Sequence, residues 1–132
     1  GYKSTIGGGQ NNTASSYSTV GGGYYNNAGY KSTIGGGQNN IASGYYSTVA
    51  GGIANKVYGF CSGILGGTLN TVQVAHTKSF IIGSNLTSNA SCTTFVNNLS
   101  AQGAIYAGNG FTGDIAGCTS ITVTNGIITA AS

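Results

Sequence analysis

The chain has 132 residues, enough for one domain, and its 39% hydrophobic content with nine tyrosines and only 4% charged residues excludes the composition of a disordered segment. Its 25 glycines occur without proline and without a three-residue period, which excludes a collagen helix. The net charge of +3 comes from four scattered lysines and one aspartate, so we expect no nucleic-acid partner.

No stretch of the sequence approaches the roughly 18–20 apolar residues of a membrane span, and we expect no membrane insertion in this segment. The sequence begins inside a repeat unit, without an initiator methionine or a signal peptide. We therefore expect it to belong to a longer fibrous protein in an extracellular location, on a virion or a cell surface, with any anchor or export signal outside it.

A short motif repeats along the chain. The sequence Thr5-Ile6-Gly7-Gly8-Gly9 returns, with variation, from Thr19, Thr33, Thr48 and Gly63, at steps of 14, 14, 15 and 15 residues. One unit of this size has too little apolar surface to offset its own ordering entropy. The repeat therefore predicts an all-β fold, a parallel β-roll solenoid in which each unit is one coil stacked on its neighbours.

Aligning the units places apolar residues in two columns about half a coil apart. Because side chains alternate along a strand, this predicts two short strands per coil and a serine column that also points inward, with the threonine column outward. The core columns are Ile6, Val20, Ile34, Val49 and Ile64, and Ala14, Ala28, Ala42, Val57 and Val72; the serines are Ser4, Ser18, Ser32, Ser47 and Ser62.

Glycine and asparagine columns mark the turns. A sharp turn requires positive φ angles, which glycine adopts freely and asparagine tolerates. Asparagines stacked in register also predict a ladder of amide hydrogen bonds from coil to coil. The predicted turn and ladder residues are Asn12, Asn26, Asn40, Asn55 and Asn70, with Gly8, Gly22, Gly36, Gly51 and Gly66.

The pattern continues in weaker form beyond residue 72. Ser79-Phe80-Ile81 and Thr93-Thr94-Phe95 read as two degenerate units, and the longer step before Phe80 predicts an excursion over residues 74–78. We expect the β-roll to occupy residues 1–100. Residues 101–132 then form a Gly-rich connector and a C-terminal β-hairpin, because β-branched residues alternate around Asn125-Gly126.

The segments Asn12-Thr13-Ala14-Ser15 and Asn40-Ile41-Ala42-Ser43-Gly44 resemble the repeats of trimeric autotransporter adhesin heads, the YadA-like β-roll, which also occur in phage tail-fibre proteins. Residues 93–99 resemble the end of such a head, and residues 121–129 resemble the C-terminal stretch of many tail fibres. The resemblance covers residues 2–100 and implies a left-handed β-roll in a homotrimer. The heptad stalk and the membrane anchor of the adhesins are missing, which favours a viral fibre.

Composition gives a separate argument for trimerisation. A thin roll with a core of Ala, Val, Ile and Ser is only marginally stable, and association would bury the apolar residues that lie outside the core columns. A solitary solenoid with capped ends is the alternative. The surplus apolar residues are Tyr24, Tyr25, Ile41, Ile53, Leu65, Leu69, Phe80 and Phe95.

The sequence offers few groups for catalysis. With one acid, Asp114, and one histidine, His76, it lacks a carboxylate pair, and a catalytic triad would require distant residues to meet. We expect no enzyme activity, no cofactor and no metal site. The spacing of Cys61, Cys92 and Cys118 matches no zinc motif. An odd count leaves intermolecular bridges or free thiols, and we expect free, buried cysteines.

One further column alternates lysine and tyrosine. Tyr17, Lys31 and Tyr46 are the candidate ligand surface, with glycans on a host cell or other surface as the expected partner; the alternative is a purely structural stacking of lysine on tyrosine. Three functions remain open: a trimeric fibre segment for surface attachment, a self-assembling structural filament, and an ice-binding solenoid. Ice binding is the weakest, because the outward threonines lack a second threonine two residues away.

Overall fold

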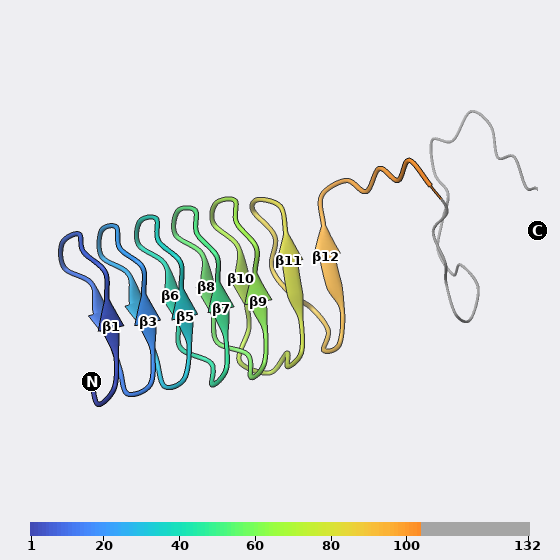
Figure 1. The fold of residues 1–132 in the computed structure, drawn as a ribbon. Helices are drawn as coiled ribbons and strands as arrows, with labels where there is room; N and C mark the ends of the chain where they lie inside the picture. Colours follow the sequence, from blue (N-terminus) through green and yellow to red (C-terminus); the bar gives the residue numbers. More distant parts are fainter. Residues whose placement is uncertain (104–132) are drawn as a thin grey trace, which may run out of the picture. The chain divides into compact units, whose positions relative to one another are not determined.

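The computed structural model describes residues 1–103. The chain divides into two units, Gly1–Ser100 and Ala101–Ser132. The first unit is an all-β solenoid of parallel strands (Figure 1). In the described part of the chain there is no helix long and apolar enough to cross a membrane. The expected C-terminal hairpin around Asn125, and all but the start of the Gly-rich connector, lie outside the described residues.

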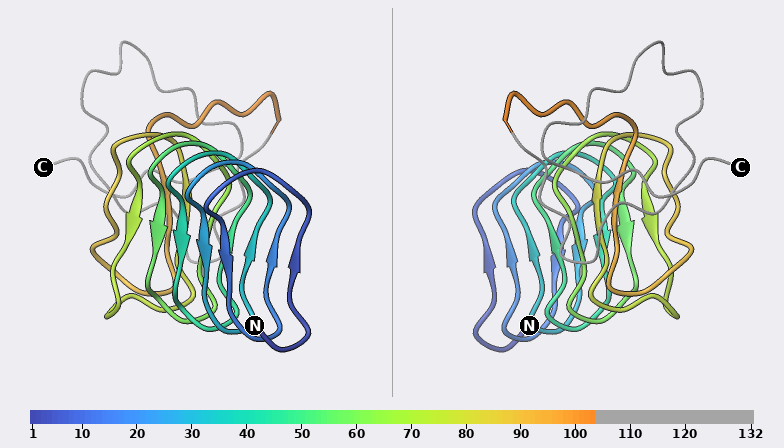
Figure 2. Two further views of the ribbon diagram at one scale, coloured as in Figure 1. Left: turned by 90° about the vertical axis from the view of Figure 1, so that its left-hand side faces the viewer. Right: turned by 90° about the vertical axis from the view of Figure 1, so that its right-hand side faces the viewer.

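Two parallel sheets, one on each side of the coils, make up this unit (Figures 1 and 2). The larger has the order β1-β3-β5-β7-β9-β11-β12 and the smaller β10-β8-β6-β4-β2. The strands are β1 (Thr5–Ile6), β2 (Thr13–Ala14), β3 (Thr19–Val20), β4 (Asn27–Ala28), β5 (Thr33–Ile34), β6 (Ile41–Ala42), β7 (Thr48–Val49), β8 (Lys56–Val57), β9 (Gly63–Ile64), β10 (Thr71–Val72), β11 (Phe80–Ile82) and β12 (Thr94–Val96). The predicted parallel solenoid of 14–15-residue coils is thus confirmed.

The strand register follows the repeat and continues through the degenerate units. Thr5 pairs with Thr19, whereas Phe80 pairs with Gly63 on one side and Thr94 on the other. The extra residues between β10 and β11 bulge outward, and Val74 there is 77% exposed. The bulge accommodates the extra residues of this longer repeat, so the strand pairing of the larger sheet continues without interruption.

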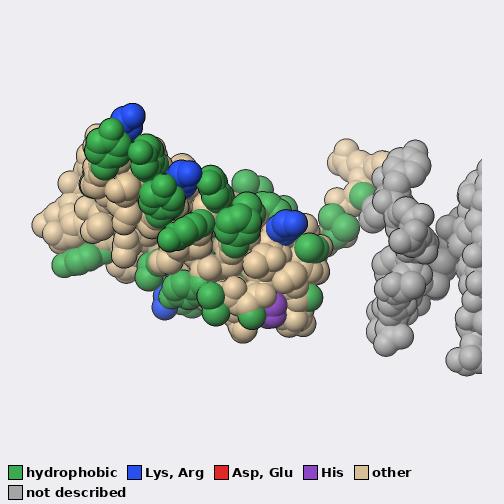
Figure 3. All heavy atoms as spheres, turned by 90° about the horizontal axis from the view of Figure 1, so that it is seen from below, with side chains coloured by type: hydrophobic (Ala, Val, Ile, Leu, Met, Phe, Trp, Pro, Cys, Tyr) green, Lys and Arg blue, Asp and Glu red, His purple; other side chains and the backbone are tan. Residues whose placement is uncertain are grey.

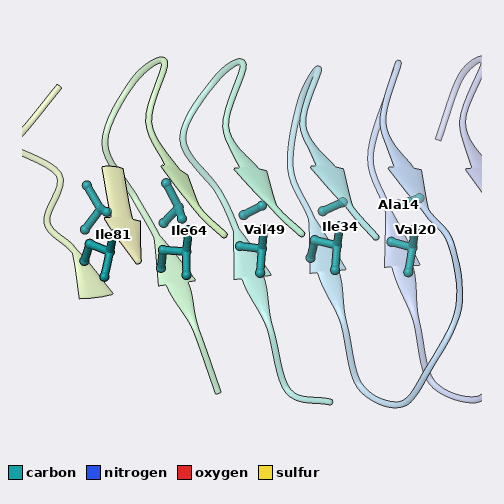
Figure 4. Packing of buried hydrophobic residues seen from close by; sticks show 10 residues of the cluster. Ala14, Val20, Ile34, Val49, Ile64 and Ile81 are labelled. Atoms are coloured by element: carbon teal, nitrogen blue, oxygen red, sulfur yellow. The ribbon is translucent and has the colours of Figure 1, made fainter. Parts of the chain in front are cut away.

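The core consists of two facing columns of small and branched residues between the sheets (Figure 4). Val20, Ile34 and Val49 are completely buried, whereas Ile6 is 46% exposed because, among the described residues, its coil has a neighbour on one side only. The serine column is buried as well, apart from the half-buried Ser4. Ser32 Oγ donates to Ala42 O at 2.8 Å, and the hydroxyls of Ser18 and Ser62 also donate to backbone carbonyls, whereas Ser47 Oγ has no partner. The other buried core residues are Ala14, Ala28, Ala42, Val57, Ile64, Val72 and Ile81.

The turns differ from the prediction by one residue. The left-handed conformation belongs to the residue before each asparagine of the column and to the glycine after each predicted turn glycine. Gly8 and Gly22 have extended φ angles near 158°, and Gly36, Gly51 and Gly66 are not left-handed either. The left-handed positions are Gly9, Gly23, Gly37, Gly52 and Gly67, and Asn11, Tyr25, Asn39, Ala54 and Leu69, with φ between 53° and 98°.

The asparagine column forms a continuous ladder inside the turn. Asn55 is completely buried; its Nδ2 donates to Gly51 O at 3.0 Å and to Gly67 O at 2.9 Å. Its Oδ1 accepts from the backbone N–H of Asn70 at 3.2 Å and from Asn70 Nδ2 at 3.0 Å. Each amide therefore satisfies backbone groups of its own coil and the next, which a turn residue on the surface would leave to water. Asn12, Asn26 and Asn40 make equivalent bonds.

Replacing Asn55 by Ala is expected to lower the free energy of unfolding by about 2–3 kcal/mol, because the buried N–H of Asn70 and the carbonyl of Gly51 lose their partners and Gly67 O retains only Ile53 N–H. Urea denaturation followed by circular dichroism measures the loss. The matched control is Asn27→Ala. Because Asn27 is exposed on β4, this replacement should lower the free energy of unfolding by less than about 0.5 kcal/mol. Equal losses in the two variants would show that the ladder adds no stability.

Candidate ligand-binding ribbon

Exposed aromatic side chains line the turn that leads from each strand of the smaller sheet to the next strand of the larger one. We call this surface the aromatic ribbon; it consists of Tyr2, Lys3, Tyr17, Tyr30, Lys31, Tyr45, Tyr46 and Phe60. Figure 3 shows hydrophobic and lysine side chains alternating in a band along this side of the solenoid. At least one ribbon residue is present in each of the first five coils.

The backbone fixes the spacing of the ribbon. Lys3, Tyr17, Lys31 and Tyr46 all have φ angles between 49° and 58°. Backbone hydrogen bonds link the rungs at this turn: Tyr17 N–H donates to Tyr2 O at 2.8 Å, and Lys31 N–H to Ser16 O at 3.1 Å. Equivalent side chains therefore repeat at the strand spacing of about 4.8 Å.

The rings contact one another from coil to coil. Ring centroids lie 5.5 Å apart for Tyr2 and Tyr17, 5.8 Å for Tyr17 and Tyr30, and 5.2 Å for Tyr30 and Tyr45. Most of these pairs are edge-to-face, the arrangement that aromatic quadrupoles favour. Such contacts restrict the rings before any ligand arrives, so that less side-chain entropy is lost on binding.

The two lysines of the ribbon lie over tyrosine rings. Lys31 Nζ is 5.2 Å from the ring centroid of Tyr30 and 5.1 Å from that of Tyr46, and it donates to Tyr46 Oη at 3.0 Å. The hydrogen bond with Tyr46, followed by electrostatic interactions with Tyr30 and Tyr46, raises the pKa of Lys31 above its ordinary value. Lys3 Nζ lies 5.3 Å from the ring of Tyr2. Both cations therefore remain at the surface, fixed by aromatic neighbours.

The ligand surface proposed from sequence lies on the ribbon, since all three of its residues belong to it: Tyr17, Lys31 and Tyr46. Lys31 contacts Tyr46, but Tyr17 contacts Tyr2 and Tyr30, which belong to a neighbouring column that the sequence analysis did not select. Tyr45 and Phe60 are two further ribbon residues that the sequence analysis did not select. The signal that could have found them is an aromatic residue directly before the left-handed position, in four of the first five coils.

Shallow grooves also lie on other faces of the described residues, and two of them differ clearly in polarity. The first, of about 370 Å³, follows the outer face of the larger sheet between Thr48 and Thr94, and its apolar side chains Leu65, Phe80 and Ile82 are 65%, 49% and 48% exposed. The second, of about 490 Å³, is polar and runs beside the smaller sheet. Its lining includes Asn11, Asn27, Asn39, Tyr25 and Lys56.

The one histidine of the sequence lies in the outward bulge and contacts the next coil. His76 Nδ1 lies 2.8 Å from Ser88 Oγ, and the same hydroxyl accepts from Gln73 N–H at 3.0 Å. Because Ser88 is only 1% exposed, a substrate cannot reach its hydroxyl, and this contact holds the bulge against the next coil. Cys61 and Cys92 are free thiols, but Cys61 is half-buried and Cys92 is exposed, so the expected burial is wrong for both. Residues 1–103 contain no group of three His, Cys, Asp or Glu residues that could hold a metal ion.

Comparison with known proteins adds no further assignment to this surface. No protein-family model matches the chain, and no curated protein matches it. The proposal for its function therefore depends on the geometry of the coils and their exposed columns.

Proposed function

We propose that this chain is a non-enzymatic fibre segment for surface attachment, exposed on a virion or a cell, and that its aromatic ribbon contacts glycans. The observation that carries the proposal is the ribbon itself: exposed tyrosines in register along successive coils, which the core does not require. A solenoid that needed the turn for structure alone could use small polar residues there, as it does at Ser16.

The chemistry of the ribbon suits sugars. A tyrosine ring offers an apolar face to the C–H groups of a pyranose, and its hydroxyl can bond to a sugar hydroxyl. Tyrosine also loses little side-chain entropy on binding. Each rung gives a weak contact, and several rungs in one molecule, multiplied by several molecules in an assembly, raise the affinity through avidity.

Changing Tyr17 and Tyr46 together to Asn is expected to weaken binding to a glycan array at least about tenfold, through the loss of two stacking contacts. Asn tolerates the left-handed conformation at both positions, so the fold should persist. The matched control is Tyr24→Ala, since Tyr24 is 41% exposed on the opposite turn. Equal binding by the unaltered chain, the double variant and the control variant would contradict a role for the ribbon in glycan binding.

We also propose that the chain forms a homotrimer through the apolar groove of the larger sheet. The exposed Leu65, Phe80 and Ile82 form one apolar strip, and strips of this kind mark association surfaces. Three copies around a common axis would bury these strips and supply the apolar burial that the narrow core lacks.

Light scattering is expected to give the mass of three chains. Leu65→Asp should shift the mass towards that of a single chain, because a carboxylate cannot be buried without a partner in an apolar interface. Val74→Asp is the control, since Val74 is 77% exposed on the bulge, away from the strip, and should leave the mass unchanged. A stable monomer of the unaltered chain would remove the trimer from the proposal.

A second candidate function, a filament that grows end to end, has one observation in its favour. Each coil donates strand N–H groups to carbonyls of the coil that follows, as Thr5 N–H and Gly7 N–H do to Ser18 O and Val20 O, so the two faces of a coil are complementary. The end coil of one copy can therefore pair with the end coil of another in a head-to-tail contact. Concentration-dependent filaments in electron micrographs would support this function.

A further inference from the structure

We propose that the aromatic ribbon binds a linear anionic polysaccharide that carries one acidic group per disaccharide, lying parallel to the solenoid axis with about one sugar per coil. This inference rests on the proposed glycan function and names the ligand class for that surface.

Charge provides the first argument. The one acidic side chain of the sequence is Asp114, so residues 1–103 contain four lysines and no carboxylate side chain. The two ribbon lysines, Lys3 and Lys31, have tyrosines as their partners. A cation over an aromatic ring retains its full charge, and no carboxylate side chain of residues 1–103 opposes it. The ribbon consequently attracts an anion, and the raised pKa of Lys31 keeps that cation present well above neutral pH.

Spacing provides the second argument. Lys3, Tyr17, Lys31 and Tyr46 occupy one position in four successive coils. At about 4.8 Å per coil, the two lysines are about 10 Å apart along the axis. This is the length of one disaccharide in an extended polysaccharide. Lys3 and Lys31 can therefore each hold the acidic group of one sugar, with one neutral sugar between them; the equivalent residue of the fifth coil is Cys61.

The tyrosines provide the third argument, since they occupy the rungs between the cations. Tyr17 lies between Lys3 and Lys31, and Tyr46 follows Lys31. An aromatic face suits an uncharged sugar, so over the first four coils the ribbon alternates cation and ring in the way that acidic and neutral sugars alternate in the polymer. A polymer charged at every residue, such as a polyuronate or a single-stranded nucleic acid, would leave half of its charges facing tyrosine rings.

The test uses the full 132-residue chain and four probes: hyaluronan oligosaccharides, which have one carboxylate per disaccharide; carboxyl-reduced hyaluronan, its neutral counterpart; oligogalacturonate, with a carboxylate on every sugar; and single-stranded DNA. We expect hyaluronan to bind most tightly, with an affinity that falls as salt rises. Lys31→Gln should weaken it about three- to fivefold and Lys3→Gln with Lys31→Gln about tenfold. Lys56→Gln removes the same charge on β8, outside the ribbon, and should change the affinity less than about twofold.

The outcomes separate this inference from the function on which it rests. Equal affinity for hyaluronan and its carboxyl-reduced form, or equal effects of Lys31→Gln and Lys56→Gln, would overturn the anionic ligand while glycan attachment stands. If oligogalacturonate or DNA bound more tightly than hyaluronan, the ligand would not need to alternate acidic and neutral units, and this part of the inference would be overturned. Absence of binding to all four probes overturns the inference, and absence of binding to a broad glycan array removes the proposed function as well. Unchanged circular dichroism spectra establish that each variant is folded.

Discussion

Val49→Asp is expected to cost at least about 4 kcal/mol and to prevent the central coils from forming, since it places a carboxyl group where no partner exists. Val49 is completely buried in β7, between Ile34 and Ile64 of the adjacent strands. Its immediate surroundings are the side chains of the two core columns, so the acid must either remain charged without solvation or take up a proton and stay unbonded.

An outward residue of the adjacent strand provides the control for this prediction. Thr33 is exposed in β5 and lies outside the residues that line the apolar groove, so Thr33→Asp should change the free energy of unfolding by less than about 0.5 kcal/mol. Urea denaturation of both variants gives the comparison. A larger loss in Thr33→Asp would mean that the inward and outward faces of the larger sheet are reversed.

Gly52→Ala has the second large expected effect, a loss of at least about 2 kcal/mol. Gly52 has a φ of 96°, a conformation that side chains with a Cβ rarely adopt. An added Cβ would also overlap the carbonyl oxygen of Gly67 in the next coil. Because that oxygen belongs to the backbone and accepts from Asn55, it cannot move without disturbing the ladder.

Gly51→Ala is the matched control, one residue earlier in the same turn. The nearest atom to its added Cβ is Gly36 O at 4.0 Å, and its φ lies outside the left-handed region. We expect this change to be neutral or slightly stabilising, because alanine restricts the unfolded chain. Thermal unfolding of the two variants decides the matter, and similar melting temperatures would contradict the turn geometry described above.

Much of the fold could be predicted from sequence because a solenoid converts periodicity directly into contacts. Once Thr5 is aligned with Thr19, the strand pairs and the buried columns follow, and even the 17-residue step to Phe80 fixes its partner. The parallel register and the buried position of Val49 needed no information beyond alternation along a strand.

The turns could not be placed with the same accuracy. Several adjacent residues of each turn are compatible with a left-handed conformation, and the repeat gives no signal that separates Gly51 from Gly52. The unexpected positions include Ala54 and Leu69, residue types that do not favour positive φ. They adopt it because backbone bonds to the adjacent coils, such as Ala54 N–H to Gln38 O at 2.9 Å, determine the conformation.

Only some residues of the ribbon could be predicted from the sequence. The lysine–tyrosine column could be found by alignment, whereas the participation of Tyr30 and Tyr45 depends on contacts between two columns in different coils. Such contacts follow from the directions of side chains on a turn, which a period of 14 or 15 residues does not specify. The exposure of Ile6 depends in the same way on the absence of a neighbouring coil among the described residues.

Removing one complete coil tests most directly the claim that repeated rungs provide both the fold and the attachment surface. Deletion of residues 35–49 joins Ile34 to Ala50, which is equivalent to Gly35 in the alignment, and removes Tyr45 and Tyr46. The account predicts a chain that still unfolds cooperatively, with glycan affinity reduced but not lost, as expected for one rung fewer. Failure of the shortened chain to fold, or binding that is either unchanged or abolished in a folded chain, would contradict it.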